Sequence, residues 1–186
     1  MAYLTLGSEA RSFELVGDSM LKRLYRFYHG DNSKRNIGFC IGGITMSQLA
    51  NRLAGRTVNQ DVILQIGTND LLVEGVELDI EKLKLEMNNL IAVVKESGAD
   101  NITILTLPPI PSCGYRNGVL KIWKAFNKWI LSELPSEERN VSVVNTGKIF
   151  YSFTKNHFKK DLFNDDMLHW NAQGMDLVLQ MLDESL

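Results

Sequence analysis

Only two cysteines, Cys40 and Cys113, occur in this chain of 186 residues. Two are too few for a disulfide framework or a zinc site, so we expect a protein of a reducing compartment, the cytoplasm. No apolar run is long enough to cross a membrane. The N-terminus lacks the basic region and apolar stretch of a secretory signal. Glycine-rich phosphate-binding fingerprints and internal repeats are also missing, and nothing in the sequence calls for a metal or a cofactor.

Neither positive nor negative charge is in large excess in this chain. The formal net charge is −2, which favours neither nucleic acid nor an acidic membrane as a bulk partner. Hydrophobic residues make up 45% of the chain, as in ordinary globular proteins. The length suits one domain with a full core, so we expect a single domain over residues 1–186, with residues 1–12 as an N-terminal extension.

Strand-like and helical patterns alternate along the chain, which predicts an α/β fold with a five-stranded parallel sheet and helices on both faces. The expected strands are Phe13–Val16, Ile37–Ile41, Val62–Ile66, Asn101–Leu107 and Val141–Val144. The expected helices are Met20–Tyr28, Met46–Leu53, Leu78–Lys95, Val119–Leu134 and Gly174–Leu182.

Ser19 follows the first of these strands in the stretch Gly17-Asp18-Ser19-Met20. Gly17 permits a tight turn from strand to helix. Ser19 then lies at the turn or in the first helical position, where free N–H groups and the helix dipole favour an oxyanion. The position suits a nucleophile, and the plainer alternative is a serine that only caps the helix.

Asp166 and His169 are three residues apart before the last helix, so one turn can aim both side chains the same way. A carboxylate that accepts the Nδ1 proton of a histidine leaves Nε2 free to take a proton from a serine. The other two histidines, His29 and His157, have no carboxylate at useful local spacing. His169 is therefore the best candidate base, and the alternative is a capping aspartate beside a partly exposed histidine.

Two more polar turns follow strands. Gly42-Gly43-Ile44-Thr45 and Gly67-Thr68-Asn69-Asp70 both come at strand ends, and ligands bind at that edge of open parallel sheets. The Gly43 N–H, the Asn69 amide and the Ser19 N–H would together form an oxyanion hole. Ordinary turns are the alternative, since glycine pairs and Asn-Asp are common in them.

These four stretches together resemble the SGNH or GDSL hydrolase family, named for residue types that stand here at Ser19, Gly43, Asn69 and His169. The Gly-Gly-x-Thr stretch also looks like that of platelet-activating-factor acetylhydrolase subunits. One departure is Met20, where the family often has leucine. The resemblance spans about residues 13–184.

The resemblance implies a three-layer, flavodoxin-like α/β/α sandwich that hydrolyses carboxyl esters, acetyl groups or thioesters. We expect a small-molecule or lipid ester as substrate and no metal or cofactor. Ser19 would be the nucleophile, His169 the base and Asp166 its orienting acid, with Ser19, Gly43 and Asn69 as oxyanion donors. Some relatives keep the fold without hydrolysis, including the RNA-binding C-terminal domain of the insect protein Oskar. An RNA- or protein-binding module is therefore the alternative function.

Two further features bear on that choice. Lys121, Lys124 and Lys128 step along one helix between Trp123, Phe126 and Trp129, and a second basic group lies at Lys22, Arg23 and Arg26. We interpret both as solvated helix faces, with an RNA-backbone patch as the alternative. The proline-rich stretch Pro108–Tyr115 follows the fourth strand, where it could form a pocket wall or a stiff connector.

Overall fold

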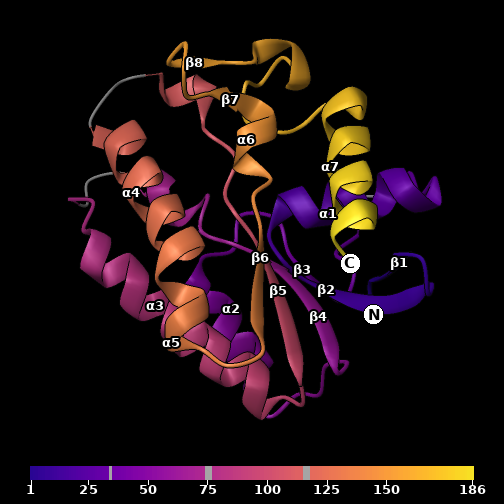
Figure 1. Cartoon of the computed structure of the whole chain (residues 1–186). Helices are drawn as coiled ribbons and strands as arrows, with labels where there is room; N and C mark the ends of the chain where they lie inside the picture. Colours follow the sequence, from indigo (N-terminus) through magenta and orange to yellow (C-terminus); the bar gives the residue numbers. More distant parts are fainter. Residues whose placement is uncertain (34, 74–76, 115–117) are drawn as a thin grey trace.

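The protein is built around one sheet, seen in a computed structural model that describes residues 1–33, 35–73, 77–114 and 118–186 (Figure 1). The strand order is β1-β2-β4-β5-β6, and the short β3 also pairs with β2. Within this sheet, all pairings of the described strands except that of β1 with β2 are parallel, which confirms the predicted α/β class. The parallel strands are β2 (Arg11–Gly17), β3 (Phe39–Cys40), β4 (Asp61–Gln65), β5 (Asn101–Leu105) and β6 (Val141–Val144).

Strand β1 (Tyr3–Leu6) lies within the segment that we expected to be an extension of the domain. It pairs antiparallel with β2, with Leu4 opposite Phe13, and so adds a sixth strand to the sheet. Leu4 and Leu6 are buried because alternate residues of a strand point to the same face. This period-2 pattern spans only four residues, too few to predict a strand from the sequence alone.

The two faces of the sheet are covered by different helices (Figure 1). Helices α1 (Ser19–His29) and α7 (Ala172–Ser185) pack on one face, together with Leu15 of β2 and Ile63 of β4. Helices α2 (Met46–Leu53), α3 (Ile80–Glu96), α4 (Val119–Ser132) and α5 (Leu134–Glu137) lie on the other, over neighbouring residues such as Val16 and Leu64. Successive residues along a strand thus pack into two separate hydrophobic cores, one on each face of the sheet.

The loops after β2, β3 and β4 meet at the carboxyl edge of the sheet, because parallel strands all end there. The chain between β6 and α7 returns to the same edge through several short elements. These are α6 (Gly147–Phe150), β7 (Tyr151–Ser152), β8 (His157–Phe158) and the 3₁₀ turn η4 (Lys160–Leu162). The part of the chain that the structure describes contains no helix both long and apolar enough to cross a membrane.

Candidate active site

The turn from β2 into α1 places Ser19 at the first position of the helix. A Cβ atom on Gly17 would lie 2.1 Å from the carbonyl oxygen of Gln65, so only glycine fits between the two strands. Asp18 is the N-cap, and its Oδ1 accepts the Met20 N–H at 2.8 Å. Ser19 is therefore not the cap, which removes the plainer explanation for a serine here. Helix geometry leaves its N–H without a partner inside the helix.

Asp18 itself is fully buried. Burial raises the pKa of its carboxyl to about 7, and the negative charge of Asp70 adds to the effect, while the hydrogen bond from Met20 opposes it. A buried carboxyl thus stands directly beside the candidate nucleophile. The sequence pattern Gly-Asp-Ser gave no indication of this shift.

The turn before α7 brings Asp166 and His169 together. Asp166 Oδ1 accepts the backbone N–H groups of Leu168 and His169 at 3.0 and 2.9 Å, and Met167 has a positive φ of 51°. The N–H of Ser112 donates to the Met167 carbonyl at 3.0 Å. The proline-rich stretch therefore supports this turn. None of its described residues lines the pocket that opens beside Ser19, and Tyr115 lies outside the described residues.

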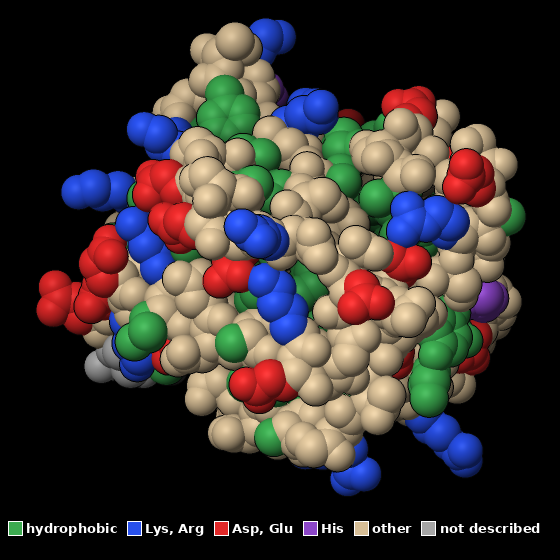
Figure 2. Space-filling view, turned by 60° about the horizontal axis from the view of Figure 1, so that its bottom comes forward, with side chains coloured by type: hydrophobic (Ala, Val, Ile, Leu, Met, Phe, Trp, Pro, Cys, Tyr) green, Lys and Arg blue, Asp and Glu red, His purple; other side chains and the backbone are tan. Residues whose placement is uncertain are grey.

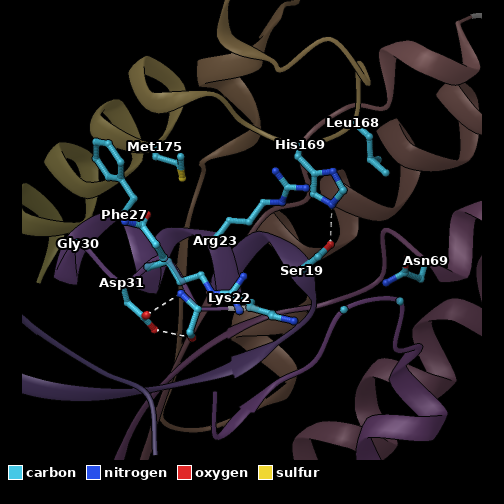
Figure 3. Close-up of a pocket in the computed structure, with 15 residues that line it drawn as sticks. Ser19, Lys22, Arg23, Phe27, Gly30, Asp31, Asn69, Leu168, His169 and Met175 are labelled. Carbon is cyan, nitrogen blue, oxygen red and sulfur yellow. Dashed lines mark hydrogen bonds between the residues drawn. The ribbon is translucent and has the colours of Figure 1, made fainter. Parts of the chain in front are cut away.

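Ser19, His169 and Asp166 form one hydrogen-bonded chain (Figure 3). Ser19 Oγ lies 2.9 Å from His169 Nε2, and His169 Nδ1 lies 2.7 Å from Asp166 Oδ2. Burial alone would raise the pKa of Asp166, but the hydrogen bonds from His169 and from the Leu168 N–H outweigh it and lower that pKa to about 2. The carboxylate is thus charged at neutral pH and fixes the tautomer that leaves Nε2 free to accept a proton.

Gly43 and Asn69 lie in two loops that are bonded to each other. The Asn69 amide donates to the Ile44 carbonyl at 2.9 Å, and both Asp70 oxygens accept the Met46 N–H, at 3.1 and 3.3 Å. Gly43 has a φ of 75°, which favours glycine. An amide carries two hydrogens, so the second hydrogen of Asn69 is free to face a ligand. Figure 3 shows this amide on the same side of the pocket as Ser19.

A pocket of about 840 Å³ opens beside the serine. It is lined by four of the five predicted site residues, namely Ser19, Gly43, Asn69 and His169. The structure thus brings these residues together, while their catalytic roles stay a prediction. The pocket also takes in Lys22, Arg23 and Arg26, which the sequence analysis interpreted as a solvated face. The sequence did carry a signal for this placement, because residues three, four and seven positions after Ser19 lie on the same helix face as Ser19.

The remaining candidates lie elsewhere. His29 Nε2 contacts the Tyr3 carbonyl at 2.9 Å, and His157 is exposed in β8. Within the described residues, no group of three or more His, Cys, Asp or Glu side chains is arranged to hold a metal ion. Along α4, Trp123, Phe126 and Trp129 are buried in the core, so they cannot stack on nucleic-acid bases.

The sequence model of the OSK domain matches residues 2–186. The chain belongs to the OSK domain family. No curated protein matches it in sequence.

Solved structures share the fold of this chain. The OSK domain of Drosophila Oskar superposes with a TM-score of 0.79 and 21% identity, covering 94% of this chain and 88% of that one. A GDSL-like lipase from Bacteroides thetaiotaomicron superposes with a TM-score of 0.72 and 16% identity, covering 93% of this chain and 86% of that one. The lipase/acylhydrolase from Enterococcus faecalis superposes with a TM-score of 0.66 and 18% identity, covering 92% of this chain and 93% of that one. The resemblance to GDSL hydrolases and to Oskar is thus confirmed, and at these identities it concerns the fold.

Proposed function

We propose that this OSK-family domain is a serine esterase that hydrolyses carboxyl esters with acetyl or other short acyl groups. The observation that carries the proposal is the hydrogen-bonded chain from Ser19 through His169 to Asp166, open to a pocket of about 840 Å³. Acyl transfer needs Asp166 as a carboxylate, and the lowered pKa of Asp166 meets that need. The two cysteines are free thiols, which supports action in a reducing compartment such as the cytoplasm.

In the first step, Ser19 Oγ attacks the ester carbonyl carbon while His169 Nε2 takes the hydroxyl proton. The carbonyl oxygen becomes an oxyanion, to which the N–H groups of Ser19 and Gly43 and the amide of Asn69 would donate. As the tetrahedral intermediate collapses, the bond to the leaving oxygen breaks. His169 returns its proton to that oxygen, so a neutral alcohol departs and an acyl-serine remains.

In the second step, water takes the place of the alcohol. His169 accepts one of its protons as the oxygen attacks the acyl carbon, and the same proton then returns to Ser19 Oγ as the acyl bond breaks. The products are the carboxylic acid and the original serine. Asp166 remains a carboxylate throughout, in keeping with its lowered pKa.

The test is labelling by a fluorophosphonate probe combined with turnover of p-nitrophenyl acetate. Wild type should be labelled, and Ser19→Ala should lose labelling and several orders of magnitude of turnover. The fold should survive, because Asp18 and not Ser19 caps α1. Ser132→Ala on the exposed side of α4 is the matched control and should behave as wild type. A folded Ser19→Ala protein with unchanged turnover would sink the proposal.

A second candidate is a binding module without catalysis. Membership of the OSK domain family favours it, because the resemblance drawn from the sequence included an RNA-binding relative, the C-terminal domain of Oskar. Lys121 and Lys128 are exposed along α4 and could contact phosphates. Binding without labelling by the fluorophosphonate would select this function over the first.

A further inference from the structure

One wall of the main pocket is formed by a single face of α1. Lys22, Arg23 and Arg26 follow Ser19 by three, four and seven residues, and all three line the pocket with it. Side chains at these spacings project from the same side of a helix. In Figure 3 the Arg23 side chain extends toward His169. The candidate nucleophile and three cations therefore share one cavity.

The positive charges of these three residues are not balanced by ion pairs within the described parts of the chain. Among the described residues, no carboxylate forms an ion pair with Lys22, Arg23 or Arg26. Lys22 Nζ donates to the Asn36 side-chain oxygen at 2.9 Å, and Arg26 Nη2 donates to the Arg35 carbonyl at 2.6 Å. Both acceptors are neutral, so they satisfy hydrogen bonds without balancing charge.

Two further observations show that the charges and donors of these three cations are not fully compensated. The Nε atom of Arg26 is buried and has no hydrogen-bond partner among the residues that the structure describes. Burial lowers the pKa of Lys22, and repulsion from Arg26 and Arg23 lowers it further. An anion bound among these groups would relieve both the repulsion and the unpaired donor.

The pocket does contain one carboxylate besides the cations. Asp31 lies toward the end of the pocket away from Ser19 (Figure 3). Its two oxygens accept the Ser33 N–H and hydroxyl, at 2.8 and 3.0 Å. These bonds, and more weakly the positive charge of Arg26, lower the pKa of Asp31 and keep it a carboxylate. One carboxylate against three cations still leaves a net positive charge along the wall of α1.

The cations lie at a defined distance from the reacting centre. A Cβ atom at Gly42 would be 3.9 Å from Ser19 Cβ and 4.0 Å from Lys22 Nζ, so the ammonium lies beside the proposed oxyanion loop. Arg26 follows Ser19 by seven residues, almost two helical turns or about 10 Å along the helix axis. The apolar side chains of Phe27 and Met175 also line the pocket.

We propose that the pocket selects soluble esters that carry a carboxylate or phosphate group roughly 5–10 Å from the scissile carbonyl, bound by Lys22, Arg23 and Arg26. This inference rests on the proposed esterase function and names its substrate class. A guanidinium binds carboxylate and phosphate oxygens in pairs, which fixes both position and orientation. A positively charged wall also raises the local concentration of anionic substrates. A neutral ester would leave three cations without an anion.

The test compares esters that differ only in the anionic group. One pair is mono-p-nitrophenyl adipate against p-nitrophenyl hexanoate, with the charge on the acyl side. The other is 4-acetoxyphenyl phosphate against phenyl acetate, with the charge on the alcohol side. In at least one pair, the kcat/KM of wild type should be about tenfold higher for the anionic ester, the effect of one or two charge-assisted hydrogen bonds.

Removal of one positive charge from the wall of α1 should then weaken the preference for the anionic ester. Arg26→Gln and Lys22→Gln should each lower the ratio of anionic to neutral kcat/KM several-fold, and Arg26→Glu should invert it. Arg139→Gln is the matched control, since Arg139 is exposed before β6 at the opposite edge of the sheet. Equal rates for both members of each pair, with hydrolysis intact, would overturn the inference and leave the esterase proposal standing.

A binding measurement keeps the inference testable even if neither ester is hydrolysed. Ser19→Ala protein is titrated with phenyl phosphate by calorimetry, with and without Arg26→Gln. Binding that weakens at least about fivefold on Arg26→Gln supports the anion site independently of catalysis. Absence of binding in both proteins, or displacement of phenyl phosphate by sub-micromolar single-stranded RNA, would overturn the assignment of a small ester.

Discussion

Asn69 serves the candidate site in two ways. One hydrogen of its amide holds the Ile44 carbonyl, and the other is free to donate to an oxyanion. Asn69→Ala should therefore lower kcat by about 10²–10³, as for the loss of one oxyanion donor, with a smaller change in KM. Leaving the buried Ile44 carbonyl unpaired should also cost about 1–3 kcal/mol of stability. Steady-state kinetics and urea unfolding measure the two effects separately.

The control is Asn51→Ala on the exposed face of α2, which should change neither quantity. If kcat hardly moves in Asn69→Ala while stability falls, the residue only joins the two loops. That outcome would remove Asn69 from the proposed oxyanion hole without affecting Ser19.

The residues that sequence reasoning found and missed differ in one physical respect. Ser19, Asp166 and His169 could be predicted because the motifs that carry them fix a local turn. The face of α1 that meets the pocket depends instead on how the helix packs through Leu21 and Leu24, which only the fold decides. Lys22, Arg23 and Arg26 therefore looked like a solvated face.

At the scale of elements, the start of α1 combines a helix cap with a carboxyl of raised pKa. Folding raises the pKa of Asp18 from 3.8 to about 7, chiefly through burial. Between these values the folded protein binds more protons than the unfolded chain, so the free energy of unfolding should fall as pH rises from about 4 to 7. Each unit between the two pKa values is worth about 1.4 kcal/mol.

Asp18→Asn keeps an oxygen for the Met20 N–H and removes the ionisation. Urea unfolding at several pH values should show wild type losing stability relative to the variant between pH 4 and 7, and no further above that. Asp70, with a pKa raised to about 6 by burial and by Glu86, acts in the same direction in both proteins. Parallel stability curves for wild type and Asp18→Asn would contradict the burial argument.

At the scale of the whole molecule, the order of strands and helices followed from alternating periodicities, and the parallel sheet with helices on both faces is confirmed. The edge strand β1 was missed because its pairing with β2 is a tertiary contact that few residues encode. Likewise, the proline-rich stretch was correctly expected at the carboxyl edge of the sheet. Its partner there, the Met167 carbonyl, lies far along the chain and could not be inferred.

The distribution of charge over the whole surface bears on the second candidate function. Figure 2 shows Lys and Arg side chains interspersed with Asp and Glu, with no field of one sign on that face. On α4, Lys124 donates to Asn156 at 2.8 Å and lies over the ring of Tyr151, while the aromatic residues between the lysines are buried. The row therefore offers phosphate contacts without base stacking.

We expect RNA binding by this row to be weak and non-specific. In a filter-binding titration with single-stranded RNA at two salt concentrations, wild type and the double variant Lys121→Glu, Lys124→Glu should both bind poorly at physiological salt. The matched control is Lys82→Glu with Lys84→Glu on α3, which reverses the same number of charges. Several phosphate contacts would instead make log K fall steeply with log salt, by roughly 0.7 for each phosphate neutralised on a single strand. Sub-micromolar binding lost only in the α4 variant would establish a nucleic-acid surface on the face of the sheet opposite α1, separate from the pocket at Ser19.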